Sequence, residues 1–335
     1  MSTGIDRSGN NHGSRPTVGR NELSGRFIDL HVTVEKRFHG MRLDLFLTKR
    51  FRLSRSRAVK VIASNLTINN LKPSKAGVRV ACGDKIHIRR PAPKDPPVPT
   101  DYVVLQEDSE YTAVGKPAGL PVHPTGNFLE NTLTSLLKKR YGSDSAPVPA
   151  HRLDRETSGV ILMCRTKRAE RELKKCFSEN KVQKTYMALV HGRVAEPGKV
   201  DFPLGPDTNS IIRIKQGVNP EGRPSLTHYH PVKTTDSFSL LEIRPETGRQ
   251  HQIRAHMEAI GHPIVGDKIY GKEPQIFLNY IEHGMTPEIM EKLLLPFHAL
   301  HAFSIIFPHP ITGETTRVDA PPPPYFTNFP FSLEM

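Results

Sequence analysis

His151-Arg152-Leu153-Asp154-Arg155-Glu156-Thr157-Ser158-Gly159 is the stretch that decides the fold of this chain. The apolar run Val160-Ile161-Leu162-Met163-Cys164 follows it directly and predicts a buried strand. We therefore expect Asp154 on a short loop at the mouth of a sheet, with an arginine on either side. Nearby positive charge lowers the pKa of a carboxyl group, so Asp154 is expected to stay ionised even when partly buried. An anionic carboxylate in such a place can act as a nucleophile, a general base or a metal ligand.

A second interpretation of this loop stays open. Most Arg–Asp pairs on loops are solvated ion pairs that contribute little to stability. The loop alone therefore makes Asp154 a candidate for catalysis, and support has to come from other parts of the chain.

The composition limits the classes of function. The length of 335 residues suits one large or two medium domains. The formal net charge of +13 points to a polyanionic partner, although many proteins without one are basic too. No apolar run is long enough to span a bilayer, so no membrane partner is expected. Three widely spaced cysteines fit neither a disulfide framework nor a zinc site, which favours a reducing compartment and a cytoplasmic protein.

Changes in composition divide the chain into four segments. Residues 1–30 are rich in Gly, Ser, Asn and Arg and predict a mobile tail. Residues 31–90 form a small basic module. The proline-rich run 91–99 predicts a stiff linker that lets this module move relative to the rest. Residues 100–325 form the larger domain.

The small module shows two short helices. Leu43, Phe46, Leu47 and Phe51 recur at helical spacing. Ser54 is a good N-cap for a second helix, and three basic side chains are expected on its outer face: Arg55, Arg57 and Lys60. The alternative interpretation is that these charges only keep the surface of a small domain solvated.

The larger domain alternates strand-like runs with single helices. Phe238–Ile243 predicts a strand, and the helix that follows it is expected to end at Gly261. Thr286 and Pro287 mark the start of a late helix. Such a pattern favours an α+β fold around a mixed, mostly antiparallel central sheet with flanking helices, beside the small N-terminal α/β module.

Five sequence blocks resemble the RluA-type pseudouridine synthases and occur in the order of that family. The first two are Lys116–Pro124 and the 151–159 stretch, whose Asp154 matches the family's invariant aspartate. The others are Lys184–Val190, then Thr247–Met257 with Gly261–Asp267, and finally Leu300–Ala302 with His309–Glu314. The resemblance spans residues of about 100–320 and implies the pseudouridine synthase fold, with a cleft across the middle of the sheet.

The same resemblance assigns roles to single residues. It implies a catalytic Asp154, and it maps Tyr186 onto the family's active-site tyrosine. It makes Arg249 the basic partner of Asp154, with Arg254 as the runner-up and otherwise a contact to RNA. Arg152 is expected to fill the gap that a uridine leaves when it swings out of the RNA, or else to support the loop. Whether Asp154 attacks the sugar carbon, attacks the ring or removes a sugar proton stays open.

The small module resembles the S4 RNA-binding module. The likeness rests on Arg42-Leu43-Asp44 and on the Gly83-Asp84 turn. In that family the helical pair lies against the RNA backbone. The resemblance therefore implies that Arg55, Arg57 and Lys60 bind RNA.

No metal or cofactor is indicated by the motifs. His251 and His256 are five positions apart on a predicted helix, which suits one metal ion poorly. Neither a phosphate-binding loop nor a dinucleotide-binding motif is present, so no nucleotide cofactor is expected.

The leading hypothesis is thus a monomeric RNA pseudouridine synthase, an isomerase that acts on large-subunit ribosomal RNA or a pre-ribosomal particle. Transfer RNA is the alternative substrate. A non-catalytic S4-type RNA-binding or ribosome assembly factor is the alternative from another class. A glycosidase or nuclease that uses Asp154 and Glu156 is disfavoured, since two carboxylates on one tight loop are poorly placed to flank one bond.

Overall fold

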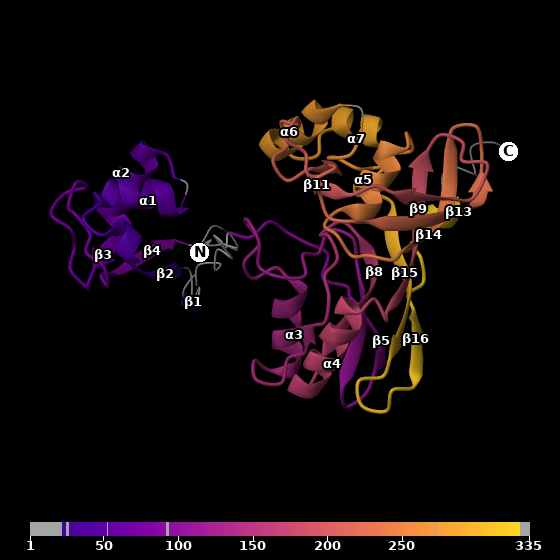
Figure 1. The fold of residues 1–335 in the computed structure, drawn as a ribbon, viewed down its shortest axis with the longest axis horizontal. Helices are drawn as coiled ribbons and strands as arrows, with labels where there is room; N and C mark the ends of the chain where they lie inside the picture. Colours follow the sequence, from indigo (N-terminus) through magenta and orange to yellow (C-terminus); the bar gives the residue numbers. More distant parts are fainter. Residues whose placement is uncertain (1–21, 25–26, 52, 92–93, 272, 329–335) are drawn as a thin grey trace, which may run out of the picture. The chain divides into compact units, whose positions relative to one another are not determined.

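The computed structural model describes residues 22–24, 27–51, 53–91, 94–271 and 273–328. The chain divides into two compact units between Lys94 and Asp95 (Figure 1). Most of the predicted tail lies outside the described residues. Its end does not, because β1 (Glu22–Ser24) and β2 (Phe27–Thr33) are antiparallel strands, so the predicted tail boundary at residue 30 is too late.

The first unit is a small sheet covered by two helices. Its strand order is β1-β2-β4-β3, with β3 at Leu66–Ile68 and β4 at Lys85–Pro91. A 3₁₀ turn, η1 (Lys36–Phe38), precedes α1 (Leu43–Phe51) and α2 (Arg55–Asn65).

The two helices follow the predicted pattern. Leu43, Phe46 and Leu47 are fully buried on α1, because helical spacing places them on the face that meets the sheet. The hydroxyl of Ser54 accepts a hydrogen bond from the Arg57 amide and caps α2. The basic side chains of α2 stay on its exposed face.

The proline-rich run does not behave as one free linker. Pro91 is the last residue of β4 in the first unit. The Asp95 carboxylate accepts three backbone N–H groups of the second unit at 2.7 Å, those of Leu129, Glu130 and Asn131. Residues 95–99 are therefore held by the second unit, since a carboxylate that binds three amides fixes the backbone on both sides. The predicted linker at 91–99 is shorter than expected in the part that the structure describes.

A ten-stranded mixed sheet forms the centre of the second unit (Figure 1). Its main path runs β10-β13-β14-β9-β15-β8-β6-β5, with β16 beside β15 and β7 beside β8. The strands are β5 (Val103–Glu107), β6 (Tyr111–Lys116), β7 (Val148–Pro149), β8 (Ser158–Cys164), β9 (Gln183–His191), β10 (Gly198–Asp201), β13 (Leu226–Thr234), β14 (Phe238–Pro245), β15 (Leu300–Pro308) and β16 (Thr315–Asp319). A separate hairpin pairs β11 (Leu204–Pro206) with β12 (Gln216–Val218).

Within the described residues β8 and β15 form the one parallel pair, and the other pairs are antiparallel. The predicted α+β fold with a mostly antiparallel sheet is thus confirmed. Gly159 makes this central pair possible, because it has a φ of 108° and a Cβ there would lie 2.2 Å from the Ala302 carbonyl oxygen. The glycine that closes the Asp154 stretch is therefore needed where the two halves of the sheet meet.

Helices cover each half of the sheet. The half with β5, β6 and β8 is packed by α3 (Leu133–Tyr141) and α4 (Lys167–Ser178). The half with β9 and β14 is packed by α5 (Gln252–Ala259). Two further helices, α6 (Pro274–His283) and α7 (Pro287–Leu293), follow, and α8 (Tyr325–Asn328) is the last. Thr286 and Pro287 start α7 as predicted, whereas α6 was not predicted.

Candidate active site

Asp154 lies on the loop that leads into β8, at the centre of the sheet. Lys116 holds the loop in place. Its ammonium donates hydrogen bonds to the carbonyls of Pro117, Leu120 and Arg155 at 2.9–3.0 Å. The Gly119 amide donates to the Arg155 carbonyl as well. Burial lowers the pKa of Lys116 to about 7, and the neighbouring Asp154 charge opposes this. Three carbonyl acceptors match the three N–H groups of the charged amine.

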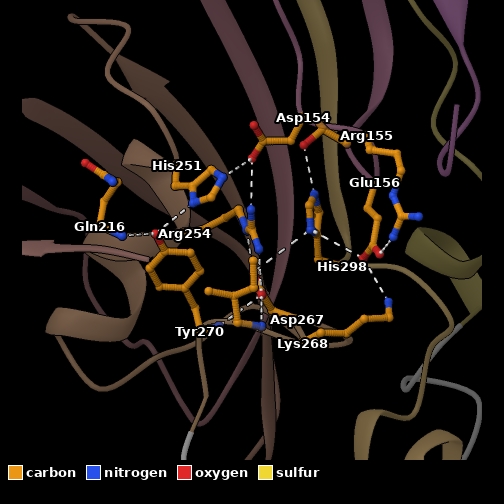
Figure 2. A network of polar contacts seen from close by, with 12 residues as sticks. Asp154, Arg155, Glu156, Gln216, His251, Arg254, Asp267, Lys268, Tyr270 and His298 are labelled. Atoms are coloured by element: carbon orange, nitrogen blue, oxygen red, sulfur yellow. Dashed lines mark hydrogen bonds and ion pairs between the residues drawn. The ribbon is translucent and has the colours of Figure 1, made fainter. Parts of the chain in front are cut away.

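The cation that faces Asp154 is Arg254, from the first turn of α5. Its Nη1 donates to Asp154 Oδ2 at 2.9 Å, and its Nε and Nη2 bind both oxygens of Asp267 at 2.6 and 2.8 Å (Figure 2). The two nitrogens that bind Asp267 are buried with it, so the guanidinium of Arg254 has little freedom to move away from Asp154. Burial opposes the ionisation of Asp154, but the charge and hydrogen bond of Arg254, together with the two neighbouring imidazoles, outweigh it and hold the pKa of Asp154 below its ordinary value.

This result corrects the expected cause of the ionisation. The arginines beside Asp154 in the sequence do not pair with it. Arg152 is exposed, and Arg155 donates to Glu156 at 2.8 Å. The guanidinium comes instead from a residue 100 positions later in the chain.

His251 approaches Asp154 from the other side. Its Nε2 lies 3.8 Å from Asp154 Oδ2, and its Nδ1 lies 2.9 Å from the hydroxyl of the buried Tyr270. The backbone amide of Gln216 donates to the same hydroxyl at 2.9 Å. Burial lowers the pKa of His251 to about 4, although the charge of Asp154 opposes this, so the imidazole is neutral at pH 7.

A second buried ion pair lies on the opposite side of the loop (Figure 2). The Glu156 carboxylate accepts from Lys268 at 2.9 Å and from Arg155 at 2.8 Å. Nδ1 of His298 lies 3.8 Å from Glu156 Oε2 and 4.0 Å from Asp267 Oδ2. The network thus holds equal numbers of carboxylates (Asp154, Glu156 and Asp267) and cations (Arg155, Arg254 and Lys268). The charges of these six side chains balance without a proton on His298. Burial lowers the pKa of His298 to about 4, in keeping with this balance.

Glu156 is unsuited to share a substrate with Asp154. Its side chain is buried and both of its oxygens are bound by cations. The two-carboxylate arrangement needed by a glycosidase is therefore missing at this loop.

Tyr186 lies in the middle of β9, opposite Ile243 of β14 and Ala302 of β15. Its side chain packs against the core clusters of both halves of the sheet. Burial, with a further contribution from the charge of Asp154, raises the pKa of Tyr186 well above its ordinary value. The ring is thus at the junction of the two halves and within electrostatic reach of Asp154. The active-site role of Tyr186 stays a prediction.

Arg249 does not occupy its predicted place. Its Nε donates to the Pro224 carbonyl at 3.1 Å on an exposed surface, and its amide donates to the Gln252 side chain. The expected Arg249–Asp154 pair is therefore wrong and Arg254, the runner-up, forms that pair. The prediction that Arg254 binds RNA is wrong as well, because its guanidinium is buried between two carboxylates.

Arg152 is exposed at the edge of this site. Burial lowers the pKa of His123, and so do the charges of Arg152 and Lys174. Arg152 also acts on the pKa of His251, in the same direction as the burial of that imidazole. Its guanidinium therefore lies within electrostatic reach of both imidazoles.

The remaining sequence predictions concern metals and membranes. His251 and His256 diverge, since His256 is bound to the Thr227 hydroxyl and the Phe202 carbonyl. Among the described residues, no three His, Cys, Asp or Glu side chains gather as they would around a metal ion. In the same part of the chain no helix combines the length and the apolar character that a membrane span requires.

Comparisons with known proteins identify the family. The RNA pseudouridylate synthase family model matches residues 110–259. An RNA pseudouridine synthase of Chloroflexus aurantiacus, itself described as uncharacterised, is 35% identical over 84% of this chain and 86% of its own length. Ribosomal large subunit pseudouridine synthase D of Zymomonas mobilis is 33% identical over 87% of this chain and 93% of its own. The chain belongs to the RNA pseudouridine synthases, which are isomerases, and within them it is of the RluA type, as its motifs predicted.

A solved structure agrees in fold. Human RNA Pseudouridylate Synthase Domain Containing 1 matches 69% of this chain and 87% of its own with a TM-score of 0.55 and 24% identity. That likeness concerns the fold alone. The network around Asp154 rests on the contacts described above.

Sequence reasoning missed several members of this network. Asp267, Lys268 and His298 were not singled out, and His251 was considered only as a metal ligand. They lie more than 90 positions after Asp154 in the sequence, and the pairing of β8 with β15 joins the two parts of the chain in one sheet. The Gly-Asp at 266–267 belongs to the same family-like block as Arg254, and that shared block was the available signal.

Proposed function

We propose that this enzyme converts uridines of large-subunit ribosomal RNA to pseudouridine, with Asp154 as the reactive carboxylate. Large-subunit RNA is the substrate class that the name of the Zymomonas mobilis relative gives. All three cysteines (Cys82, Cys164 and Cys176) are free thiols, which fits a reducing compartment, and we place the reaction in the cytoplasm.

The reaction needs few groups. The bond from uracil N1 to ribose C1′ breaks, a bond from C5 to C1′ forms, C5 loses a proton and N1 gains one. No oxidant, reductant or co-substrate is consumed, so positioned side chains are sufficient. Whether the carboxylate attacks the sugar, attacks the ring or takes a sugar proton, it must be ionised and one oxygen must be free.

The observation that carries the proposal is the state of Asp154. Its hydrogen bond and ion pairs among the described side chains all involve Oδ2. Its side chain is 20% exposed, so it is desolvated but accessible. Arg254 lowers its pKa, which keeps the carboxylate anionic at physiological pH. Oδ1 is therefore the oxygen that can meet a uridine.

Tyr186 and Arg152 complete the proposed site. The raised pKa of Tyr186 keeps it a neutral phenol at pH 7, so we assign it to stacking on the base and hydrogen bonding, and not to a standing phenolate base. Arg152 is exposed beside the site and long enough to occupy the space of an everted uridine. Arg249, away from Asp154, is assigned no chemical step.

We further propose that the first unit supplies most of the affinity for RNA. Residues 1–94 contain 20 of the 47 Lys and Arg but only 6 of the 34 Asp and Glu. Residues 95–335 contain the other 27 and 28, so the whole positive excess lies in the first unit. Electrostatic attraction to phosphates follows such an excess. Arg57 and Lys60 lie exposed on α2, while Arg55 is exposed but also lies 3.5 Å from the buried Asp44.

The experiment measures tritium release from RNA labelled at uridine C5, since each isomerisation frees one such proton. Three substrates are compared: a protein-free large-subunit RNA fragment, large ribosomal subunits and transfer RNA, each from cells that lack the gene. The expected result is release from large-subunit RNA or its particle and none for Asp154→Asn. Asp236→Asn, an exposed carboxylate, serves as the matched control and should match the wild type.

Three outcomes would overturn parts of the proposal. If the Asp154→Asn variant stays active, the carboxylate has no role in the reaction. Release from transfer RNA alone replaces the substrate. Loss of activity in the Asp236→Asn control would show that charge in general, and not this site, determines the rate.

A further inference from the structure

His251 has a backbone conformation that needs an explanation. Its φ of 56° and ψ of 18° lie in the left-handed region, at the residue that precedes α5. Side chains with a Cβ rarely adopt this conformation, and those that do cluster at functional sites. His251 makes no side-chain hydrogen bond that caps the helix. We therefore relate the left-handed backbone of His251 to the position of its imidazole beside Asp154.

The contacts of Tyr270 fix the form of that imidazole. Tyr270 is fully buried, and within the described residues its hydroxyl is hydrogen-bonded to two groups, the Gln216 amide and Nδ1 of His251. The amide can only donate, so it uses a lone pair of the hydroxyl oxygen. The hydroxyl proton then has Nδ1 as its acceptor. Nδ1 is thus unprotonated and the proton of the neutral ring is on Nε2.

Nε2 points at the carboxylate. It lies 3.8 Å from Asp154 Oδ2, the oxygen that Arg254 also binds at 2.9 Å. A separation of 3.8 Å is longer than a hydrogen bond, but a movement of less than about 1 Å would make one. Figure 2 shows Arg254 and His251 directed at the same oxygen.

We propose that His251 is a positioning residue whose neutral imidazole donates from Nε2 to Oδ2 of Asp154 and, with Arg254, reserves Oδ1 for the uridine. This inference rests on the proposed role of Asp154. It adds a residue that touches the carboxylate but not the reacting carbon atoms. Tyr270 does not contact the carboxylate in this scheme. Its hydroxyl keeps the proton of the His251 ring on Nε2.

The first test is spectroscopic and needs no turnover. Nitrogen-15 NMR of histidine-labelled full-length protein at pH 7 distinguishes protonated from unprotonated ring nitrogens, and the His251→Gln spectrum identifies the signals of His251. We expect an unprotonated Nδ1 and a protonated Nε2. The opposite tautomer or a doubly protonated ring would overturn the proposal.

The second test is kinetic, with single-turnover rates at saturating RNA. Gln offers an N–H donor near the place of Nε2, whereas Leu offers none, and both carry a Cβ and meet the same backbone strain. His251→Leu should slow the reaction about 10- to 100-fold, the value of a hydrogen bond to a charged group. His251→Gln should recover most of the rate, and RNA affinity should not change in either variant.

Controls separate this inference from the proposed function. His228→Gln changes an exposed histidine on β13 and should leave the rate unchanged. If Asp154→Asn is inactive while His251→Leu keeps the wild-type rate, or while Gln and Leu lose equally, the positioning role fails and the proposed function stands. If Asp154→Asn stays active, the proposed function fails first.

Discussion

Arg254 is shared between two carboxylates: one nitrogen contacts Asp154 at 2.9 Å, and the other two bind Asp267 at 2.6 and 2.8 Å. Asp267 is completely buried and also accepts the amides of Ile269 and Tyr270. It therefore fixes the plane of the guanidinium, and the guanidinium fixes Oδ2 of Asp154. Burial raises the pKa of Asp267, but the charge and hydrogen bonds of Arg254, together with the Tyr270 amide, outweigh it and hold this pKa well below its ordinary value.

The shared geometry predicts that lysine cannot replace Arg254. A lysine ammonium is a point charge without the planar fork, so it cannot hold Asp267 with two nitrogens and Asp154 with a third. Arg254→Lys should lower the single-turnover rate about 100-fold or more, comparable to the loss of one preorganised donor in other active sites. Tritium release at saturating RNA measures the rate.

Arg249→Ala is the matched variant, since both arginines belong to the same sequence block. It should change the rate by no more than a few-fold, because Arg249 contacts a backbone carbonyl on the surface. Equal losses in the two variants would contradict the assignment and return Arg249 to the role that the sequence first suggested.

Lys116 should be essential to the shape of the Asp154 loop. Lys116→Met keeps the length and the apolar stem but leaves the Pro117 and Leu120 carbonyls without their donor and the Arg155 carbonyl with the Gly119 amide alone. A buried polar group that loses its partner costs about 1–3 kcal/mol. We expect a lower melting temperature and faster amide exchange at Gly119, whose N–H bonds the same loop. Lys167→Met, on the exposed face of α4, should change neither. Unchanged exchange at Gly119 would rule out an anchoring role.

The loop and the sheet were predictable because their signals are local. The apolar run after the Asp154 stretch predicts β8, and Thr286-Pro287 predicts the start of α7. Helical spacing likewise predicts one shared face for Leu43, Phe46 and Leu47, and all three are buried in the core of the first unit. Each of these features depends on residues within a few positions of one another.

The partner of Asp154 was not predictable because a backbone feature decides it. Arg249 and Arg254 lie five positions apart, and the choice depends on where the helix starts. His251 is left-handed and α5 begins at Gln252, so Arg249 lies before the helix and Arg254, in its first turn, reaches Asp154. Nothing in the composition indicates positive φ at a histidine. The contacts to Asp267 and His298 depend on chain pairing over more than 90 residues.

The neutral buried His298 predicts that acid destabilises the second unit before its carboxylates titrate. Burial lowers the pKa of His298 to about 4 from an ordinary value of 6.5. The unfolded chain then binds a proton that the folded chain does not, so stability is full above pH 6.5 and falls as the pH drops from there toward 4. The loss from this group is on the order of 3 kcal/mol.

Unfolding by urea at pH 7, 6 and 5 measures this loss, and His298→Gln is the comparison. Glutamine keeps a polar side chain near the Thr157 hydroxyl but cannot titrate. The variant should be less stable at pH 7 and its stability should fall less between pH 7 and 5. Parallel pH profiles in the two proteins would mean that His298 already carries a proton in the fold.

The uneven charge of the two units predicts where salt acts on RNA binding. Each phosphate contact contributes about 0.7–0.9 to the slope of log affinity against log salt, so three contacts by Arg55, Arg57 and Lys60 account for about 2–3. Their triple replacement by Ala should weaken RNA binding and flatten the slope by up to that amount.

The matched control replaces Lys167, Arg168 and Arg171 by Ala. It removes three cations from α4, in the unit that has no positive excess. Its slope should stay near that of the wild type. If the α4 triple variant changes the slope more than the α2 triple variant does, the main RNA contact lies on the catalytic unit. The proposal that the first unit supplies most of the RNA affinity would then be wrong.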